Sequence, residues 1–358
     1  MDIKLTKRIM LGDVAIGGGA PVSVQSMTNT DTRDVSSTLA QIRELECAGC
    51  QIVRVAVPDA ESSDALGKII AGTSLPVVAD LHFDWRLAFL VMEQGVAGIR
   101  LNPGTIARKA RVREIAAEAA SRGVTVRVGV NSGSLERRHQ GRGRKAEAAS
   151  LAQSALEGAA LISKEGVGNL KISVKASDVP RTIEAYRIVS EKSDWPLHVG
   201  VTEAGTMWSG TIKSAVGIGA LLAEGIGDTI RVSLTEDSTE EIRAGFEILK
   251  ALGLRKRGLN VIACPSCGRV EIDLVGLTKE VEKRLEALNI TRTLTVAVMG
   301  CAVNGPGEAR GADIGIAGGN GIGILIKKGK IVRKVKESEL ADILVEEVQR
   351  LAAEPAEQ

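Results

Sequence analysis

Three cysteines near the C-terminal end of the chain have the spacing of a metal or cluster site. Cys264 and Cys267 form a Cys-x-x-Cys turn, and Cys301 follows in a glycine-rich segment. A Cys-x-x-Cys pair alone also fits a redox dithiol or a zinc knuckle, so the third thiol strengthens the case for a bound metal. Tetrahedral zinc and cubane iron–sulfur clusters both take four donors, which leaves one position to be filled.

Glu308 is the candidate for that position. All histidines precede Cys264, so a compact Cys3His zinc site cannot be built from this segment. The Asn-Gly-Pro-Gly sequence at 304–307 predicts a tight turn that returns the Glu308 carboxylate towards a metal bound by Cys301. A hard carboxylate on a soft cluster is displaceable, which suggests that the iron itself binds substrate. A structural zinc ribbon with a solvated Glu308 stays open as an alternative.

Charged side chains also interrupt short apolar runs in the first part of the chain. They are Arg54, Asp80, Arg100, Arg127, Lys175, Glu203 and Arg231. A charge in a buried strand is costly unless it is paired or solvated at an open end. Arginine forks match phosphate oxygens, so the excess of cations predicts a doubly phosphorylated or cyclic diphosphate ligand, to which Asn131 and Ser233 can add neutral hydrogen bonds. Internal salt bridges without a ligand are the alternative.

The elements that must position these charges alternate between strand and helix. Strands are predicted over 22–27, 52–57, 77–81, 98–101, 124–130, 170–174, 197–202 and 226–234, with helices such as 35–48, 107–122 and 179–192 between them. This alternation predicts a (β/α)8 TIM barrel, whose active site lies at the carboxyl ends of the strands. No Gly-x-Gly-x-x-Gly lies between a strand and its helix, so a nicotinamide site has no support.

The chain is predicted to divide into a barrel over 1–253, a linker over 254–260 and a smaller α+β module over 261–358. In the module, a strand leads into Cys264 and a helix covers 277–288. A strand over 293–298 delivers Cys301, a hairpin covers 321–335, and a capped helix covers 338–352.

Composition excludes several classes of protein. Lys and Arg number 46 against 44 Asp and Glu, and aromatic residues make up 2%, which argues against nucleic acid as a partner. Neither a signal peptide nor a membrane span is recognisable. Five cysteines, an odd number, fit a reducing cytoplasm better than a disulfide framework. Cys47 and Cys50 form a second Cys-x-x-Cys that closes a helix instead of opening one, so both are predicted to be packing residues.

The sequences ACPSCGR and VAVMGCAVNGPGEA around the three thiols and Glu308 resemble the 4-hydroxy-3-methylbut-2-enyl diphosphate synthase family of the methylerythritol phosphate route to isoprenoids. The resemblance runs along nearly the whole chain. Its other motifs are QSMTNT at 25–30, ADLHF at 79–83, VRVGVNSGSL at 126–135, SVKASDV at 173–179, GVTEAG at 200–205 and IRVSL at 230–234. One position departs from the family pattern: Thr105 stands where an asparagine is expected.

The resemblance implies an iron–sulfur oxidoreductase. It would open 2-C-methyl-D-erythritol 2,4-cyclodiphosphate reductively and remove a hydroxyl, giving 4-hydroxy-3-methylbut-2-enyl diphosphate with two electrons delivered through a [4Fe-4S] cluster. The small module would be similar to the cluster domain of sulfite and nitrite reductases. A flavodoxin or ferredoxin is implied as electron donor. A head-to-tail homodimer is implied as well, in which the cluster domain of one subunit closes over the barrel of the other.

The resemblance also gives roles to the barrel residues. Glu203 is similar to the carboxylate that handles protons, and Asp80 resembles a second catalytic acid at the floor. His82, a lone histidine close to Asp80 in the sequence, is expected to be structural. The implied binders of the cyclic diphosphate are Arg54, Arg100, Arg127, Asn131, Lys175, Arg231 and Ser233.

Two other functions remain on the residues alone. One is a lyase or aldolase barrel acting on phosphosugars, with a structural zinc in the tail. The other is a zinc-ribbon protein that binds RNA through the basic loop over 131–145, which near-neutral charge and scarce aromatic residues weigh against.

Overall fold

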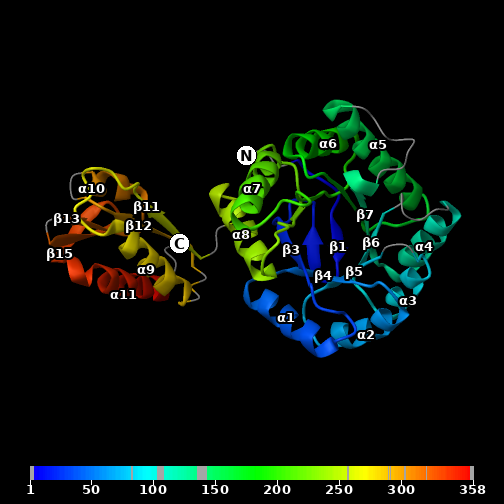
Figure 1. Cartoon of the computed structure of the whole chain (residues 1–358), viewed down its shortest axis with the longest axis horizontal. Helices are drawn as coiled ribbons and strands as arrows, with labels where there is room; N and C mark the ends of the chain where they lie inside the picture. The colour runs from blue at the N-terminus through cyan, green and yellow to red at the C-terminus, as the bar shows by residue number, and fades with distance from the viewer. Residues whose placement is uncertain are drawn as a thin grey trace. The chain divides into compact units, whose positions relative to one another are not determined.

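The computed structural model describes residues 4–81, 84–102, 109–134, 143–255, 258–288, 290, 292–301, 304–319 and 321–354. Contacts divide the chain into two compact units, Met1–Arg255 and Lys256–Gln358. Figure 1 shows both units, with strands surrounded by helices in the first and a single sheet with helices in the second.

The first unit is a barrel of eight parallel strands, as predicted. In the order of their neighbours the strands are β8 (Leu170–Lys175), β7 (Thr125–Asn131), β6 (Gly98–Leu101), β5 (Val77–Asp80), β4 (Ile52–Ala56), β3 (Ser23–Met27), β10 (Thr229–Ile230) and β9 (His198–Val199). The ring closes through a parallel bridge between Ile172 of β8 and Leu197 just before β9. The carboxyl ends of all these strands therefore meet at one mouth.

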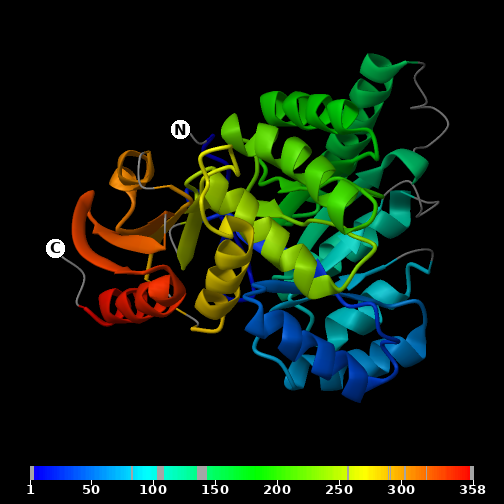
Figure 2. The ribbon, with the colours of Figure 1, turned by 60° about the vertical axis from the view of Figure 1, so that its left-hand side comes forward.

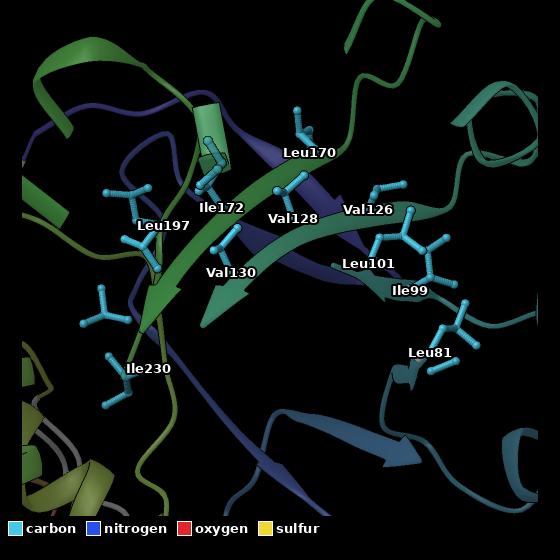
Figure 3. Packing of buried hydrophobic residues seen from close by; sticks show 14 of the residues in the cluster. Leu81, Ile99, Leu101, Val126, Val128, Val130, Leu170, Ile172, Leu197 and Ile230 are labelled. Atoms are coloured by element: carbon cyan, nitrogen blue, oxygen red, sulfur yellow. The ribbon is translucent and has the colours of Figure 1, made fainter. Parts of the chain in front are cut away.

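Helices surround the barrel because the outward side chains of the strands are apolar. Val126, Val128 and Val130 alternate along β7, and Figure 3 shows them with Leu170 and Ile172 of the neighbouring strand. Aspartates cap four of the helices, since each side chain accepts a hydrogen bond from a free backbone N–H in the first turn. The helices are α1 (Val35–Cys47), α2 (Ala60–Ala71), α3 (Leu87–Glu93), α4 (Lys109–Arg122), α5 (Arg144–Ser163), α6 (Val179–Lys192), α7 (Met207–Ala223) and α8 (Ser238–Ala251), with a 3-10 turn η1 (Ser132–Ser134) after β7.

A short hairpin closes the amino-terminal end of the barrel. Its strands β1 (Ile9–Leu11) and β2 (Val14–Ile16) pack their buried side chains against Ile52 and Val78, at the opposite end from the mouth. The Thr125 hydroxyl at the start of β7 donates to the Met10 carbonyl oxygen at 2.6 Å. This hairpin was not predicted from the sequence, because three-residue strands carry too little periodicity to be recognised.

The second unit is an α+β domain with a five-stranded sheet. The strands, in spatial order, are β11 (Leu259–Ala263), β12 (Leu294–Met299), β13 (Ile314–Gly319), β14 (Ile322–Lys327) and β15 (Lys330–Lys336). The first three are parallel and the last two antiparallel. The helical elements are α9 (Leu274–Glu286), α10 (Gly305–Glu308), η3 (Ala309–Gly311), η4 (Glu337–Glu339) and α11 (Leu340–Ala353).

Each face of this sheet has its own apolar cluster. One face packs Val296 and Ile316 against Leu285 of α9 and Leu344 of α11. Figure 2 shows α11 lying along this curved sheet. The opposite face packs Met299 and its neighbours under Ala309, next to α10. The predicted module is thus present, with β13 as a strand that the sequence analysis missed.

Cys47 and Cys50, the cysteines of the second Cys-x-x-Cys, differ in burial. Cys50 is 4% exposed and packs in the barrel core as predicted, and burial raises its pKa to about 11. The prediction for Cys47 is wrong, because this last residue of α1 faces away from the buried Ile42 and Leu45 and is exposed.

Within the described residues, no helix combines the length and the apolar character needed to cross a membrane.

Candidate functional site

Inward-facing charges form a row across neighbouring strands inside the barrel. The strand register places Asp80 of β5 beside Arg100 of β6, Arg100 beside Arg127 of β7, and Arg127 beside Lys171 of β8. Residues two apart on a strand share a face, so Lys175 points to the same interior as Lys171. The fold therefore brings together charges that are far apart in the sequence.

Asp80 partly neutralises two of the arginines. Its Oδ2 lies 3.8 Å from Arg54 Nε, and its Oδ1 lies 3.6 Å from Arg100 Nη1, with all three side chains largely buried. Arg54 also donates to the Met27 sulfur at 2.8 and 3.0 Å, and a thioether is a weak acceptor. Burial lowers the pKa of Arg54 to about 10, with Asp80 opposing the shift. Asp80 thus forms ion pairs with both Arg54 and Arg100.

Arg127 and Lys175 carry the charge that Asp80 does not balance. Arg127 is 2% exposed, and its Nε and Nη1 have no hydrogen-bond partner among the described residues. Burial lowers its pKa well below the usual value, and the charges of Arg54 and Arg100 lower it further. Burial likewise lowers the pKa of Lys175, with Arg127 and Arg231 adding to the effect. An anion bound here would stabilise the charged forms of both side chains and so raise their pKa values again.

Glycines make room for two of these side chains. A Cβ on Gly129 of β7 would lie 2.9 Å from Arg100 Nε, and Arg100 Nη2 donates to the Gly129 carbonyl oxygen at 3.3 Å. A Cβ on Gly200 would lie 2.7 Å from Lys175 Nζ and 2.5 Å from the Arg231 carbonyl oxygen. Both glycines are therefore required by close approach inside the barrel.

Sequence reasoning missed Glu241, in the first turn of α8. Its carboxylate accepts from Arg231 Nη2 at 3.3 Å, from Ser26 Oγ at 2.9 Å and from the Leu234 backbone N–H at 3.0 Å. Glu241 is 4% exposed, so it neutralises Arg231 from outside the strand ring. Glu241 could not be singled out in the sequence, because an acid in the first turn of a helix is common.

Sequence reasoning also missed Lys171 and His198, which lie deeper in the barrel. Lys171 is 1% exposed and His198 is fully buried. The Lys171 ammonium and both His198 ring nitrogens have no hydrogen-bond partner within the described part of the chain. Burial lowers both pKa values well below the ordinary range, and Arg127 lowers them further. The alternation in the LKISVK segment could have placed Lys171 on the same face as Lys175.

The remaining barrel candidates lie around the same mouth. Glu203 follows β9, is exposed, and has a φ of 53°, an uncommon backbone conformation for a residue with a side chain. Such strain is often found where a side chain must be presented to a ligand. Asn131 ends β7 beside Lys175, and Ser233 follows β10, both half-buried.

The three thiols are brought to one end of the sheet of the second unit. The parallel strands β11 and β12 end before Cys264 and Cys301, with Ala263 in register with Val298. The Gly300 backbone N–H donates to Cys264 Sγ at 3.2 Å, so Cys264 lies beside the residue that precedes Cys301. A Cβ on Gly300 would lie 2.9 Å from Val270, which packs the Cys267 turn against the same point. All three cysteines are free.

The surroundings favour ligation by Cys267. Backbone and side-chain hydrogen bonds from Arg269 lower its pKa, which favours the thiolate that binds metals. The Cys301 carbonyl accepts from the Gly305 N–H at 3.1 Å, so the chain turns into α10, which ends at the exposed Glu308. No three His, Cys, Asp or Glu side chains of the described ranges surround a point suited to a single metal ion.

Three predictions lie outside the residues that the structure describes. They concern the supporting role of His82, the departure at Thr105, and the basic loop, of which residues 135–142 are not described.

Comparison with known families covers both units. The GcpE TIM-barrel domain matches residues 6–246, and the GcpE protein C-terminal domain matches residues 260–350.

Relatives with an assigned activity align over nearly the full length of both chains. The 4-hydroxy-3-methylbut-2-en-1-yl diphosphate synthase (flavodoxin) of Geobacter sulfurreducens is 55% identical over 98% of this chain and 98% of its own. The enzyme of the same name from Symbiobacterium thermophilum is 54% identical over 98% and 94%, and that from Clostridium tetani is 51% identical over 98% and 100%.

Solved structures with a similar barrel include two dihydropteroate synthases. The Yersinia pestis protein has a TM-score of 0.51 at 11% identity and covers 69% of this chain and 98% of its own. The Coxiella burnetii protein has a TM-score of 0.51 at 12% identity and covers 69% and 99%. At such identities the likeness shows a shared barrel fold alone.

Proposed function

The chain belongs to the GcpE family, and from this membership we propose that it is a flavodoxin-dependent 4-hydroxy-3-methylbut-2-en-1-yl diphosphate synthase. The reaction opens 2-C-methyl-D-erythritol 2,4-cyclodiphosphate at a carbon–oxygen bond and removes one hydroxyl group as water. Two electrons and two protons balance it. The observation that carries this conclusion is the 55% identity with the Geobacter enzyme over nearly the whole of both chains.

The barrel residues bind the diphosphate and supply a proton. Arg127 and Lys175, buried without balancing charge, gain the counter-charge of the phosphates, and Arg54, Arg100 and Arg231 complete a cationic wall. Asn131 and Ser233 donate neutral hydrogen bonds at the rim. Glu203, exposed at the mouth, holds the proton that the departing oxygen takes up. Asp80 fixes Arg54 and Arg100 in place, which makes it a positioning acid.

The thiol end of the second unit fits an iron–sulfur cluster. Cys264, Cys267 and Cys301, with Glu308 as the oxygen donor, would hold a [4Fe-4S] cluster, which supplies electrons one at a time when bound. The free thiols and the Gly300 N–H aimed at Cys264 Sγ support this, since such hydrogen bonds to sulfur are usual around clusters. A unit of this kind resembles the cluster domain of sulfite and nitrite reductases.

The proposal extends to partners and compartment. Flavodoxin appears in the names of the relatives and is the donor we favour over ferredoxin. Five free thiols suit the reducing cytoplasm. We further propose a head-to-tail homodimer, as the family resemblance implies. Association is supported by exposed apolar residues at four-residue spacing on α7, namely Trp208 at 80%, Ile212 at 47% and Val216 at 55% exposure. Such a stripe is typical of a helix face that association covers.

Anaerobic purification tests this function. We expect brown protein with about four irons and four sulfides per chain and no stoichiometric zinc. It should convert the cyclic diphosphate when reduced viologen supplies electrons. The variant Glu203→Gln should keep the cluster spectrum and lose turnover, whereas Glu236→Gln, an exposed acid after β10, should remain active. Colourless zinc protein, or an active Glu203→Gln variant, contradicts the assignment of the cluster or of the proton donor respectively.

A further inference from the structure

The edge strand of the second unit carries an exposed patch that no part of the proposed chemistry uses. β15 is last in its sheet, and it pairs with β14 so that Lys336 faces Ile322 and Lys334 faces Ile324. Opposed residues of antiparallel strands lie on one face, which here is the face of the Met299 cluster and α10. The β15 patch is defined as Ile322, Ile331, Val332, Lys334 and Lys336.

The patch combines large apolar side chains with unpaired cations. Ile322 and Ile331 are 56% exposed and Val332 is 59% exposed. Within the described residues, neither Lys334 nor Lys336 forms an ion pair, and the strand contains no acid. Acids follow directly after the strand, at Glu337 and Glu339, so the concentration of positive charge is confined to β15 itself.

The strand directions place the Lys336 end of the patch at the same end as the thiols. The parallel strands β11, β12 and β13 end there, β14 begins there, and Gly319, Ile322 and Lys336 are in register. Three strand spacings separate β12, which leads to Cys301, from β15, roughly 14 Å in all. An electron carrier on the patch would therefore stand close to the thiols.

Edge protection alone does not account for these residues. Lysines on an edge strand discourage pairing with other sheets, and that explains the cations. It does not explain three large aliphatic side chains beside them, since exposed apolar surface promotes association. An apolar centre with a charged rim is the arrangement of a protein interface.

We propose that the β15 patch is the docking surface for an acidic, flavin-carrying electron donor of the flavodoxin class. The cations attract an acidic protein, and the aliphatic residues fit the apolar dimethylbenzene edge of a flavin. One electron passes at each encounter from the reduced flavin to the cluster, so the flavin is oxidised and two encounters complete a turnover. This inference rests on the proposed function, because it needs a cluster to receive the electrons.

Charge reversal on the patch provides the test. Flavodoxin affinity should be measured anaerobically on the holoenzyme at low and high salt, using a purified bacterial flavodoxin in its oxidised state. We expect the double variant Lys334→Glu/Lys336→Glu to bind at least tenfold more weakly and with a shallower salt dependence. The variant Ile322→Ser should weaken binding severalfold. The control Lys330→Glu reverses one charge at the far end of the same strand and should bind as the wild type does.

Turnover with two reductants separates docking from chemistry. Flavodoxin-driven turnover should fall with the affinity, while turnover driven by reduced viologen stays within about twofold of wild type. Unchanged affinity in the double variant overturns the inference. An equal loss with both reductants also overturns it and assigns the patch to a contact between copies of the chain. If wild-type holoenzyme shows no viologen-driven turnover, the proposed function itself fails.

Discussion

At the scale of single residues, the barrel interior is dominated by cations that the protein alone does not neutralise. Asp80 and Glu241 each hold arginines in place, but Arg127, Lys171 and Lys175 are buried among like charges. Burying charge in this way costs stability, which a protein tolerates where a ligand of opposite charge repays the cost. The empty barrel is therefore expected to be less stable than the barrel that holds a diphosphate.

Lys171 allows the cost of this arrangement to be measured. Its folded pKa is lowered, so between that value and the ordinary lysine pKa the unfolded chain binds one proton more than the folded chain. The free energy of unfolding of the wild-type protein should therefore decrease as the pH falls through this range. We expect Lys171→Met to raise the free energy of unfolding in urea, and to raise it more at pH 7 than at pH 9.5, by up to about 1.4 kcal/mol per pH unit.

The control for this change is Lys192→Met at an exposed lysine, which should change the free energy of unfolding by less than about 0.5 kcal/mol. A loss of stability in Lys171→Met at both pH values would mean that the amine is charged and well paired in the folded protein.

Most candidate residues could be predicted because their chemistry was visible in the sequence. Arginines such as Arg54 and Arg100 are unexpected inside apolar runs and can therefore be recognised in the sequence. The fold places them at one mouth. Glu241 and His198 could not be predicted in the same way. An acid in a first helical turn and a single histidine beside a valine are ordinary, and only the barrel shows what they face.

At the scale of elements, the length of a strand decides whether its limits can be predicted from the sequence. The barrel strands β4 to β8 were close to their predicted limits, because apolar alternation runs through each of them. β9 and β10 were predicted too long, since each has two residues before the chain leaves the ladder towards Glu203 and Arg231. β13 was missed because half of its IGIAGG sequence is glycine, which lowers strand propensity.

The β1–β2 hairpin is the element whose importance was least visible. Leu11 is fully buried beneath the strands, so Leu11→Ala should destabilise the barrel by about 2–5 kcal/mol through the cavity it leaves. Leu5→Ala in the same terminal segment, at a side chain 73% exposed, should change stability by less than about 0.5 kcal/mol.

Urea unfolding followed by tryptophan fluorescence measures both variants. Since the hairpin contacts the amino ends of the strands, the turnover of folded Leu11→Ala should stay near wild type. A large drop in turnover would show that the floor and the mouth are coupled.

At the scale of the whole molecule, the proposed chemistry needs both units. In the head-to-tail dimer that we propose, the barrel of one subunit works with the thiols of the other. This arrangement can be tested by mixing two inactive variants, Glu203→Gln and Cys301→Ser, and allowing subunits to exchange.

A mixed dimer would contain one site in which both parts are intact. Because half of the dimers in an equal mixture are mixed, we expect turnover to recover to about a quarter of wild type. Each variant alone should stay inactive. No recovery after demonstrated exchange would mean that each chain uses its own thiols.

The ring of strands has one weak seam. Seven neighbouring pairs are joined by ladders, whereas β8 and β9 meet through the bridge between Ile172 and Leu197 and through a hydrogen bond from the Thr202 backbone N–H to the Ala176 carbonyl oxygen just beyond the strands. Breathing of the barrel should concentrate there, next to the strand that ends at Lys175 and the loop that carries Glu203.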